Sequence, residues 1–198
     1  MLWKNRNDRV WKQHSLGSKE VVESAKFVLN QWRYVQDKSF NHYLGYVTQD
    51  DGHEHWHLPQ IDRVKVNTDT AIFEGSMCYS HAFVARDHHG QLIEARSRCL
   101  QGTIAPEIAE AIEMKEALSW IKEMQYSNAE VETDSLQVVQ AIRSSITSSS
   151  YWGRVVDECR SLLVSLKAKN VLLRFVKRSA NRVSHYLARY SCSIADRT

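Results

Sequence analysis

The chain has 198 residues, of which 43% are apolar, 25% are charged, seven are glycine and two are proline. This composition is typical of a globular protein and excludes a largely disordered chain. No apolar run approaches the ~20 residues that a membrane-spanning helix needs, and the first eight residues are too polar for a secretory signal peptide. We therefore expect an intracellular protein, nuclear or cytoplasmic, with one domain of about 100–150 residues and an appendage.

The cysteines are widely spaced and form no C-x-x-C pair. They are Cys78, Cys99, Cys159 and Cys192. This spacing argues against a disulfide framework and against a thiolate zinc site. We therefore expect reduced thiols.

The net charge of +3 is unevenly distributed. Residues 61–149 hold 8 basic and 13 acidic side chains, whereas residues 150–198 hold 10 basic and 3 acidic ones. An acidic middle beside a basic end is consistent with a carboxylate site for cations next to a surface for a polyanion. Two differently solvated surfaces are the alternative interpretation.

The first 60 residues predict a helical extension and a linker. Apolar residues recur at spacings of three and four over residues 18–40, which predicts a helix, and a shorter helix is compatible with residues 3–12. Residues 41–62 contain Gly45, Gly52 and Pro59 and have weak periodicity, so we interpret them as a linker. The predicted domain division is therefore 1–60 and 61–198.

From residue 63 the pattern predicts three strands and then helices that alternate with strands. The strands are expected at 63–73, 79–87, 91–100, 129–134 and 171–176. The helices are expected from Pro106 to about Ile121 and at 135–144, 151–169 and 180–195. This order predicts a mixed α/β sheet, with an antiparallel edge followed by parallel strands and helices on its faces.

Three acidic residues stand where chemistry is expected in such a fold. Asp69 lies in the middle of the first strand, where a buried charge is costly unless it is paired or binds a metal. Glu110 lies on the long helix, and Asp134 ends the fourth strand, at the edge where open α/β sheets bind ligands. If the first strand is central, these carboxylates converge, and oxygen-only ligands select a hard cation such as Mg²⁺.

Each of these residues also has a purely structural interpretation. Glu110 belongs to a series spaced by three, which is typical of a solvated helix face; the series is Glu107, Glu110, Glu113 and Glu116. Asp134 precedes Ser135 and could cap the next helix, and Asp69 could pair with an arginine. The joint placement on a strand, a helix and a strand end favours a site.

Four stretches, taken in order, resemble the ribonuclease H family, specifically the reverse-transcriptase-associated domains of plant non-LTR retrotransposons and their host-encoded relatives. The stretches are Lys65–Ala71, Ala109–Ala111, Val131–Val139 and Asn181–Arg189. The resemblance covers about residues 63–195. It implies a mixed five-stranded sheet, three antiparallel strands and then parallel ones, flanked by helices and preceded by a helical segment.

The resemblance implies an endonuclease that hydrolyses the RNA strand of an RNA–DNA hybrid with two Mg²⁺ or Mn²⁺ ions about 3.5–4 Å apart. Asp69, Glu110 and Asp134 match the family's metal ligands, and Glu110 would lie near the 2′-hydroxyl that distinguishes RNA from DNA. Nucleic-acid contacts are expected from Asn67, Thr70, Ser135, Arg178, Asn181 and Arg182. The basic end, with Arg174, Lys177 and Arg189 as well, fits contacts to the hybrid backbone, a solvated face being the alternative.

One position departs from the family's pattern N-x-x-A-D-x-L-A on the last helix. Where the family commonly has an aspartate as fourth metal ligand, this chain has His185. We expect His185 to be the fourth ligand and a catalytic residue. Imidazole suits zinc, iron or nickel better than Mg²⁺, but it can also move a proton. A histidine on the helix surface without such a role is the alternative.

Two other functions stay open. One is a catalytically degenerate nucleic-acid-binding or interaction module derived from a retroelement. The other is a 3′–5′ exonuclease or integrase-like relative, although the Ala-Glu-Ala and Asp-Ser stretches resemble ribonuclease H more closely. The absence of G-x-x-x-x-G-K and G-x-S-x-G motifs argues against a P-loop enzyme and a serine hydrolase. No Cys or distant His stands at zinc spacing from the three histidines His53, His55 and His57, which argues against a zinc site there.

Overall fold

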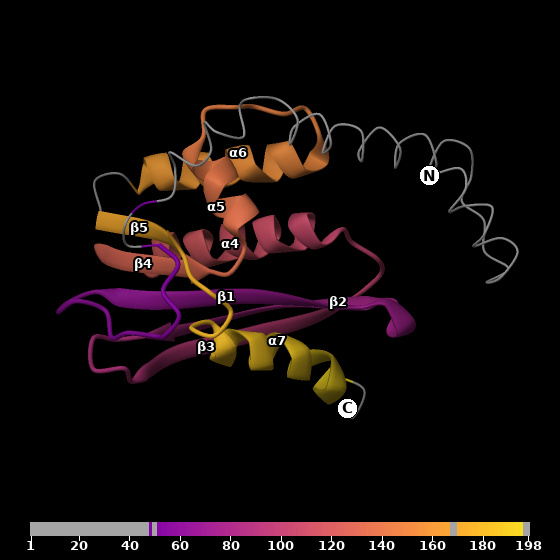
Figure 1. The fold of residues 1–198 in the computed structure, drawn as a ribbon, viewed down its shortest axis with the longest axis horizontal. Coiled ribbons are helices and arrows are strands. Elements are labelled where there is room, and N and C mark those ends of the chain that lie inside the picture. Colours follow the sequence, from indigo (N-terminus) through magenta and orange to yellow (C-terminus); the bar gives the residue numbers. More distant parts are fainter. Residues whose placement is uncertain (1–47, 49–50, 167–169, 196–198) are drawn as a thin grey trace, which may run out of the picture. The chain divides into compact units, whose positions relative to one another are not determined.

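The computed structural model describes residues 48, 51–166 and 170–195, and these residues form a mixed sheet with helices on both faces (Figure 1). The helices predicted at 3–12 and 18–40 lie outside the described residues. In the part of the chain that is described, no helix combines the length and the apolar character that a membrane span requires.

The sheet has five strands in the order β3-β2-β1-β4-β5, so the first strand of the domain is central. β1 (Val64–Phe73), β2 (Cys78–Arg86) and β3 (Leu92–Gln101) form an antiparallel meander. β4 (Asn128–Thr133) runs parallel to β1, and β5 (Asn170–Phe175) runs parallel to β4. The predicted mixed sheet is confirmed, and each strand begins and ends within one residue of its predicted bounds.

The helices cover the two faces of the sheet unequally (Figure 1). α4 (Pro106–Glu123), α5 (Leu136–Arg143) and α6 (Tyr151–Ser165) lie on one face, and α7 (Arg182–Ala195) lies on the other. A 3₁₀ turn, Glu74–Ser76, joins β1 to β2. α4 has a proline in its first turn, as the sequence predicts, because that position has no hydrogen-bonding partner for an N–H group.

The cores on the two faces differ in size. Between the sheet and α4–α6 lies a large cluster of buried apolar side chains that includes Met114 and Trp120. On the α7 face, the cluster of buried apolar residues consists of Ala71, Ala82 and Ala188. Alanine removes little apolar surface from water, so this smaller core contributes much less to stability. The attachment of α7 therefore depends strongly on polar contacts and on covalent linkage.

A disulfide joins α7 to the edge strand β3. It links Cys99 to Cys192 across 93 residues of sequence, and the Sγ atom of Cys78 lies within 4.8 Å of both sulfur atoms. The expectation of reduced thiols throughout is therefore wrong for this pair. The spacing of the cysteines in the sequence does not indicate this pair, because β3 and α7 come together only in the folded chain. Cys78 and Cys159 are free and buried.

Residues 51–58, predicted to belong to a linker, contact the sheet. Asp51 accepts hydrogen bonds from Arg143 Nη1 (2.5 Å) and from the backbone N–H of Phe175 (2.8 Å). The N–H of Gly52 donates to the carbonyl of Phe175 at 2.8 Å. These contacts tie the segment to the end of β5. The predicted division near residue 61 stays a prediction.

Candidate functional site

The structure brings the carboxylates of Asp69, Glu110 and Asp134 together at one edge of the sheet. Each offers an oxygen atom, and the three oxygens lie within 4.8 Å of one another. β1 and β4 are parallel and in register up to the residue before each aspartate, so the two aspartates emerge side by side. Glu110, in the first turns of α4, accepts a hydrogen bond from Thr70 Oγ1 at 2.9 Å.

The purely structural interpretations of Asp134 and Glu110 do not agree with the structure. Asp134 does not cap α5; the N-cap residue is Ser135, which makes no side-chain capping bond. Asp134 instead accepts a hydrogen bond from Asn181 Nδ2 at 3.3 Å. The glutamate series on α4 is not uniformly solvated either, because Glu113 is buried against the sheet. Asp134 and Glu110 instead lie in one carboxylate cluster with Asp69.

The negative charges of this cluster are poorly compensated. Burial, and next the charge of Asp134, raise the pKa of Asp69 to about 6, although the His185 hydrogen bond opposes this rise. Burial, followed by the charges of Asp69 and Asp134, raises the pKa of Glu110 to about 8. Burial likewise raises the pKa of Glu113, one helical turn further on, well above its usual range. A cation placed among these carboxylates would relieve the repulsion.

His185 contacts the cluster through Asp69. Its Nδ1 lies 2.7 Å from Asp69 Oδ2, while Arg178 Nη2 lies 3.0 Å from Nδ1 and 3.3 Å from Nε2. A guanidinium can only donate and a carboxylate can only accept, so the imidazole lies between a donor and an acceptor. Among the described residues, the group of mutually close ligand atoms is made of the three carboxylates and does not include His185.

The donor set fits a hard divalent cation. It consists of carboxylate oxygens, which Mg²⁺, Mn²⁺ and Ca²⁺ prefer, and it holds no thiolate. Glu110 and Asp134 are half-buried, so the cluster is open to solvent on one side. Asp69, Glu110 and Asp134 could therefore hold such an ion.

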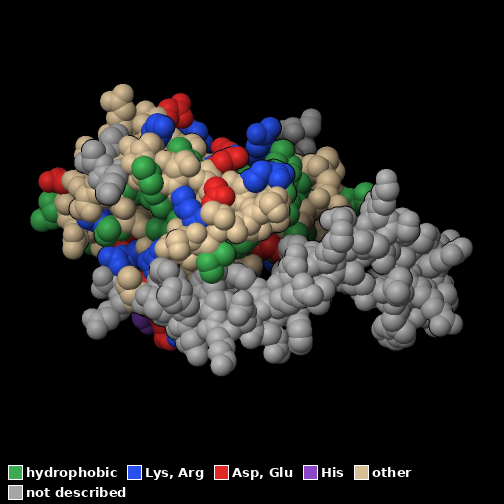
Figure 2. Space-filling view, turned by 90° about the horizontal axis from the view of Figure 1, so that it is seen from above, with side chains coloured by type: hydrophobic (Ala, Val, Ile, Leu, Met, Phe, Trp, Pro, Cys, Tyr) green, Lys and Arg blue, Asp and Glu red, His purple; other side chains and the backbone are tan. Residues whose placement is uncertain are grey.

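The residues expected to contact nucleic acid fall into two groups. Arg178, which contacts His185, and Arg182, the first residue of α7, are exposed, and Thr70 and Ser135 each follow an aspartate of the cluster. Asn67 and Asn181 are buried. Figure 2 shows the face of the molecule over α6, where Lys and Arg side chains are interspersed with Asp and Glu. The exposed arginines beside the carboxylates are therefore better placed for a polyanion.

Asn67 and Asn181 belong to a buried polar network that the sequence reasoning missed. The other members are Trp56, Lys65 and Glu132. A signal was present, because Lys65, Asn67 and Asp69 alternate along β1 and so share one face of the sheet. Polar residues on an otherwise buried strand need partners. The identity of those partners could not be read from the sequence.

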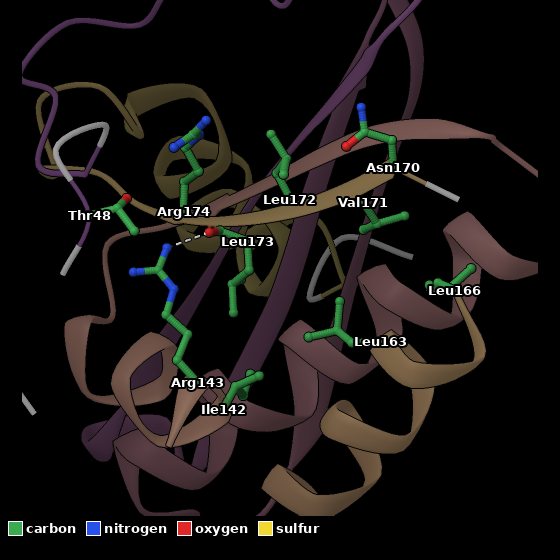
Figure 3. Close-up of a pocket in the computed structure, with 10 residues that line it drawn as sticks. All are labelled: Thr48, Ile142, Arg143, Leu163, Leu166, Asn170, Val171, Leu172, Leu173 and Arg174. Atoms are coloured by element: carbon green, nitrogen blue, oxygen red, sulfur yellow. Dashed lines mark hydrogen bonds between the residues drawn. The ribbon is translucent and has the colours of Figure 1, made fainter. Parts of the chain in front are cut away.

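Two other features lie apart from the carboxylates. A hollow of about 680 Å³ lies between β5 and helices α5 and α6, lined largely by apolar side chains such as Leu163 and Leu173 (Figure 3). At its rim, Arg143 Nη2 donates to the carbonyl of Leu173 at 2.6 Å. His53, His55 and His57 are exposed and do not belong to either group of close metal-ligating atoms in the described residues. Neither feature contributes to the carboxylate site.

Comparisons with known proteins agree with this architecture. A family model described as reverse transcriptase-like matches residues 67–191. RNase H1 from the archaeon Halobacterium salinarum is similar in structure, with a TM-score of 0.59 and 18% identity over 67% of this chain and 98% of that chain. An N-terminal RNase H domain from Mycobacterium tuberculosis has a TM-score of 0.57 and 15% identity, over 68% of this chain and 96% of that one.

A third similar structure is LC11-RNase H1 in complex with an RNA/DNA hybrid. Its TM-score is 0.53 and its identity 16%, over 67% of this chain and 98% of that chain. A search of curated proteins finds no match. At these identities the structural similarities establish the fold, and they leave the activity to be argued from the site.

Proposed function

This chain belongs to the reverse transcriptase-like family and contains an RNase H-like domain, and from that premise we propose that it is a metal-dependent endonuclease that hydrolyses the RNA strand of RNA–DNA hybrids. The observation that carries the proposal is the convergence of Asp69, Glu110 and Asp134 at the edge of the central strands. The hybrid held by LC11-RNase H1, a protein of the same fold, supports the substrate class. The origin in a plant retrotransposon stays a prediction.

The carboxylates would hold two Mg²⁺ or Mn²⁺ ions, which when bound would activate a water molecule and stabilise the leaving oxygen. Asp69 and Asp134, on adjacent parallel strands, orient their oxygens toward the same point. Glu110 approaches from α4 and would lie near the 2′-hydroxyl of the RNA strand. Because burial raises the pKa values of Asp69 and Glu110, both carboxyls would release protons when cations bind.

The residues around the carboxylates would bind and orient the hybrid. Arg178 and Arg182, both exposed, would contact phosphate groups of the backbone. His185 is held between Asp69 and Arg178, and its imidazole would accept or return a proton at Nε2 once Arg178 engages a phosphate. We propose this role for His185 beside that of fourth metal ligand.

One observation favours a second candidate, a nucleic-acid-binding module without catalysis. His185 stands where the family pattern has an aspartate, and it makes a hydrogen bond to Oδ2 of Asp69. A neutral ligand also brings no charge to attract a second cation. Loss of the second ion would leave a protein that binds hybrids and does not cut them.

A cleavage assay separates the two candidates. Purified protein is incubated with a hybrid labelled on its RNA strand, with Mg²⁺ or Mn²⁺, beside the variant Asp69→Asn. The nuclease proposal expects cleavage by the wild type and a loss of at least a hundredfold in the variant, with hybrid binding retained. If the wild type cuts no better than the variant while both bind the hybrid, the binding module is the correct function.

A further inference from the structure

The strongest unexplained feature near the site is a chain of buried side-chain amides that begins at Trp56. Its indole Nε1 lies 2.9 Å from Asn67 Oδ1. An indole N–H can only donate, so the atom of Asn67 that faces it must be the oxygen. The Nδ2 of Asn67 then faces Glu132 Oε2 at 2.7 Å and Asn181 Oδ1 at 3.3 Å, and both of these atoms accept. The orientation of the first amide is therefore fixed.

The second amide is fixed in turn. Asn181 Oδ1 accepts hydrogen bonds from Asn67 and from Ser184 Oγ, the latter at 2.8 Å. Its Nδ2 therefore points the other way, toward the carbonyl of Thr68 at 2.7 Å and toward Asp134 Oδ1 at 3.3 Å. The chain of oriented donors thus ends on a carboxylate of the candidate metal site.

The network is buried and its charges are balanced. Asn67 and Asn181 are 2% and 1% exposed. Glu132 is buried too, and Lys65 Nζ lies 2.5 Å from its second carboxylate oxygen. Leaving a buried amide without one of its partners is costly, so the network favours one arrangement.

Trp56 is itself held in place by cations and by close packing. Arg86 lies 5.1 Å and Lys65 5.7 Å from the centre of a ring of its indole. The backbone at Gly90 approaches so closely that an added Cβ would meet Leu58 at 2.9 Å and Trp56 at 3.7 Å. Trp56 is thus flanked by two cationic side chains. It also precedes residues 67–191, the part of the chain that the family model matches.

We propose that Trp56, Asn67 and Asn181 form a positioning relay that fixes the orientation of the Asp134 carboxylate for cation binding. The inference rests on the proposed function, because it takes the carboxylates as metal ligands. Asn181 donates to Oδ1 of Asp134 at 3.3 Å, and Asp134 directly follows the last residue of β4. Residues that orient metal ligands in this way commonly change metal affinity 10- to 100-fold when they are mutated.

The test replaces the first donor and measures cation binding directly. Trp56→Phe keeps an aromatic ring over Arg86 and removes the N–H that Asn67 needs. The matched control is Trp152→Phe, because Trp152 is also half-buried and also donates through Nε1, to the carbonyl of Glu107 at 3.1 Å. We expect Mn²⁺ affinity, measured by electron paramagnetic resonance, to fall about tenfold in Trp56→Phe and less than twofold in the control.

The outcomes separate this inference from the proposed function. A wild type that binds no Mn²⁺ overturns the nuclease proposal and the relay together. If the wild type binds Mn²⁺ and both variants bind it with the same affinity as the wild type, the relay alone is overturned. A general loss of stability would lower the unfolding midpoint of each variant without altering the Mn²⁺ affinity of the folded fraction.

A second measurement needs no variant and covers the case in which Trp56→Phe does not fold. In wild-type protein labelled with ¹⁵N at asparagine, the side-chain NH₂ signals of Asn67 and Asn181 are followed during Mg²⁺ titration. Both signals are expected to shift at the ion concentration that saturates the site, whereas the signal of Asn128, at the far end of β4, stays fixed. Saturable Mg²⁺ binding that leaves Asn181 unshifted would refute the relay.

Discussion

His185 Nδ1 lies 2.7 Å from Asp69 Oδ2, so an imidazole on α7 contacts a carboxylate of the central strand. The contact joins the basic end of the chain to its acidic middle. This contact also distinguishes the cluster from one of four carboxylates, because an imidazole stands at the fourth position. Asp69 has an imidazole as its hydrogen-bonded neighbour, and the cluster of close ligand atoms contains three carboxyl groups.

The first prediction concerns His185→Asp. An aspartate there would add a fourth oxygen ligand and a negative charge, so Mg²⁺ affinity should rise about tenfold and hybrid cleavage should be equal or greater. The free energy of unfolding without metal should fall, because a fourth like charge joins the cluster. Calorimetric titration with Mg²⁺ and the cleavage assay measure the two effects. His185→Ala is the control, and a complete loss of cleavage in His185→Asp would indicate a specific role for the imidazole.

The second prediction concerns pH. Burial, and after it the neighbouring carboxylates, raise the pKa of Asp69 to about 6 and that of Glu110 to about 8. The native state therefore binds more protons than the unfolded state at pH values between about 4 and 8. The free energy of unfolding that these two groups contribute must then fall as the pH rises through this window. Mg²⁺ should reduce the fall, because cations replace the protons.

Urea denaturation at several pH values, with a chelator and with Mg²⁺, measures this dependence. Glu110→Gln is the matched variant, because it keeps the shape of the side chain and does not titrate. The difference in unfolding free energy between wild type and Glu110→Gln should change with pH mainly between about pH 4.5 and 8. A difference that stays constant over this range would mean that the pKa of Glu110 is not raised.

The third prediction concerns the bond between Cys99 and Cys192. It closes a loop of 93 residues, and chain entropy alone predicts a stabilisation of about 4–5 kcal/mol. Because the apolar core under α7 is small, Cys192→Ser should unfold at a clearly lower urea concentration under oxidising conditions. The difference from wild type should nearly vanish in reductant. Mass spectrometry of an unreduced digest should detect the linked peptides, and finding only free thiols there would rule the bond out.

The fourth prediction concerns Asp51, which precedes the domain boundary expected from the sequence. Its side chain is inaccessible to solvent and accepts hydrogen bonds from Arg143 and Phe175. Asp51→Ala in the full chain should therefore lower the free energy of unfolding by about 3 kcal/mol. The control is Asp87→Ala, which removes hydrogen bonds to backbone N–H groups in an exposed turn. Equal effects of the two substitutions would support a boundary near residue 61.

Much of the fold could be predicted from the sequence, for reasons that particular residues make clear. The alternation in β1 and the proline at the start of α4 are local signals, since strand and helix periods are properties of adjacent residues. Asp69, Glu110 and Asp134 could be placed at one edge because each lies at a defined position of such an element. The position of these carboxylates relative to His185 could not be predicted from the sequence, because it depends on how α7 packs against the sheet.

Local patterns in the chain were enough to predict the order of the elements, the mixed sheet and the candidate carboxylates on its strands and long helix. The pairing of distant side chains became visible only in the fold: Cys99 with Cys192, Trp56 with Asn67, and His185 with Asp69. Periodicity specifies which face of an element is buried. The partner of a buried polar group or thiol is specified by the packing of elements that are far apart in the sequence.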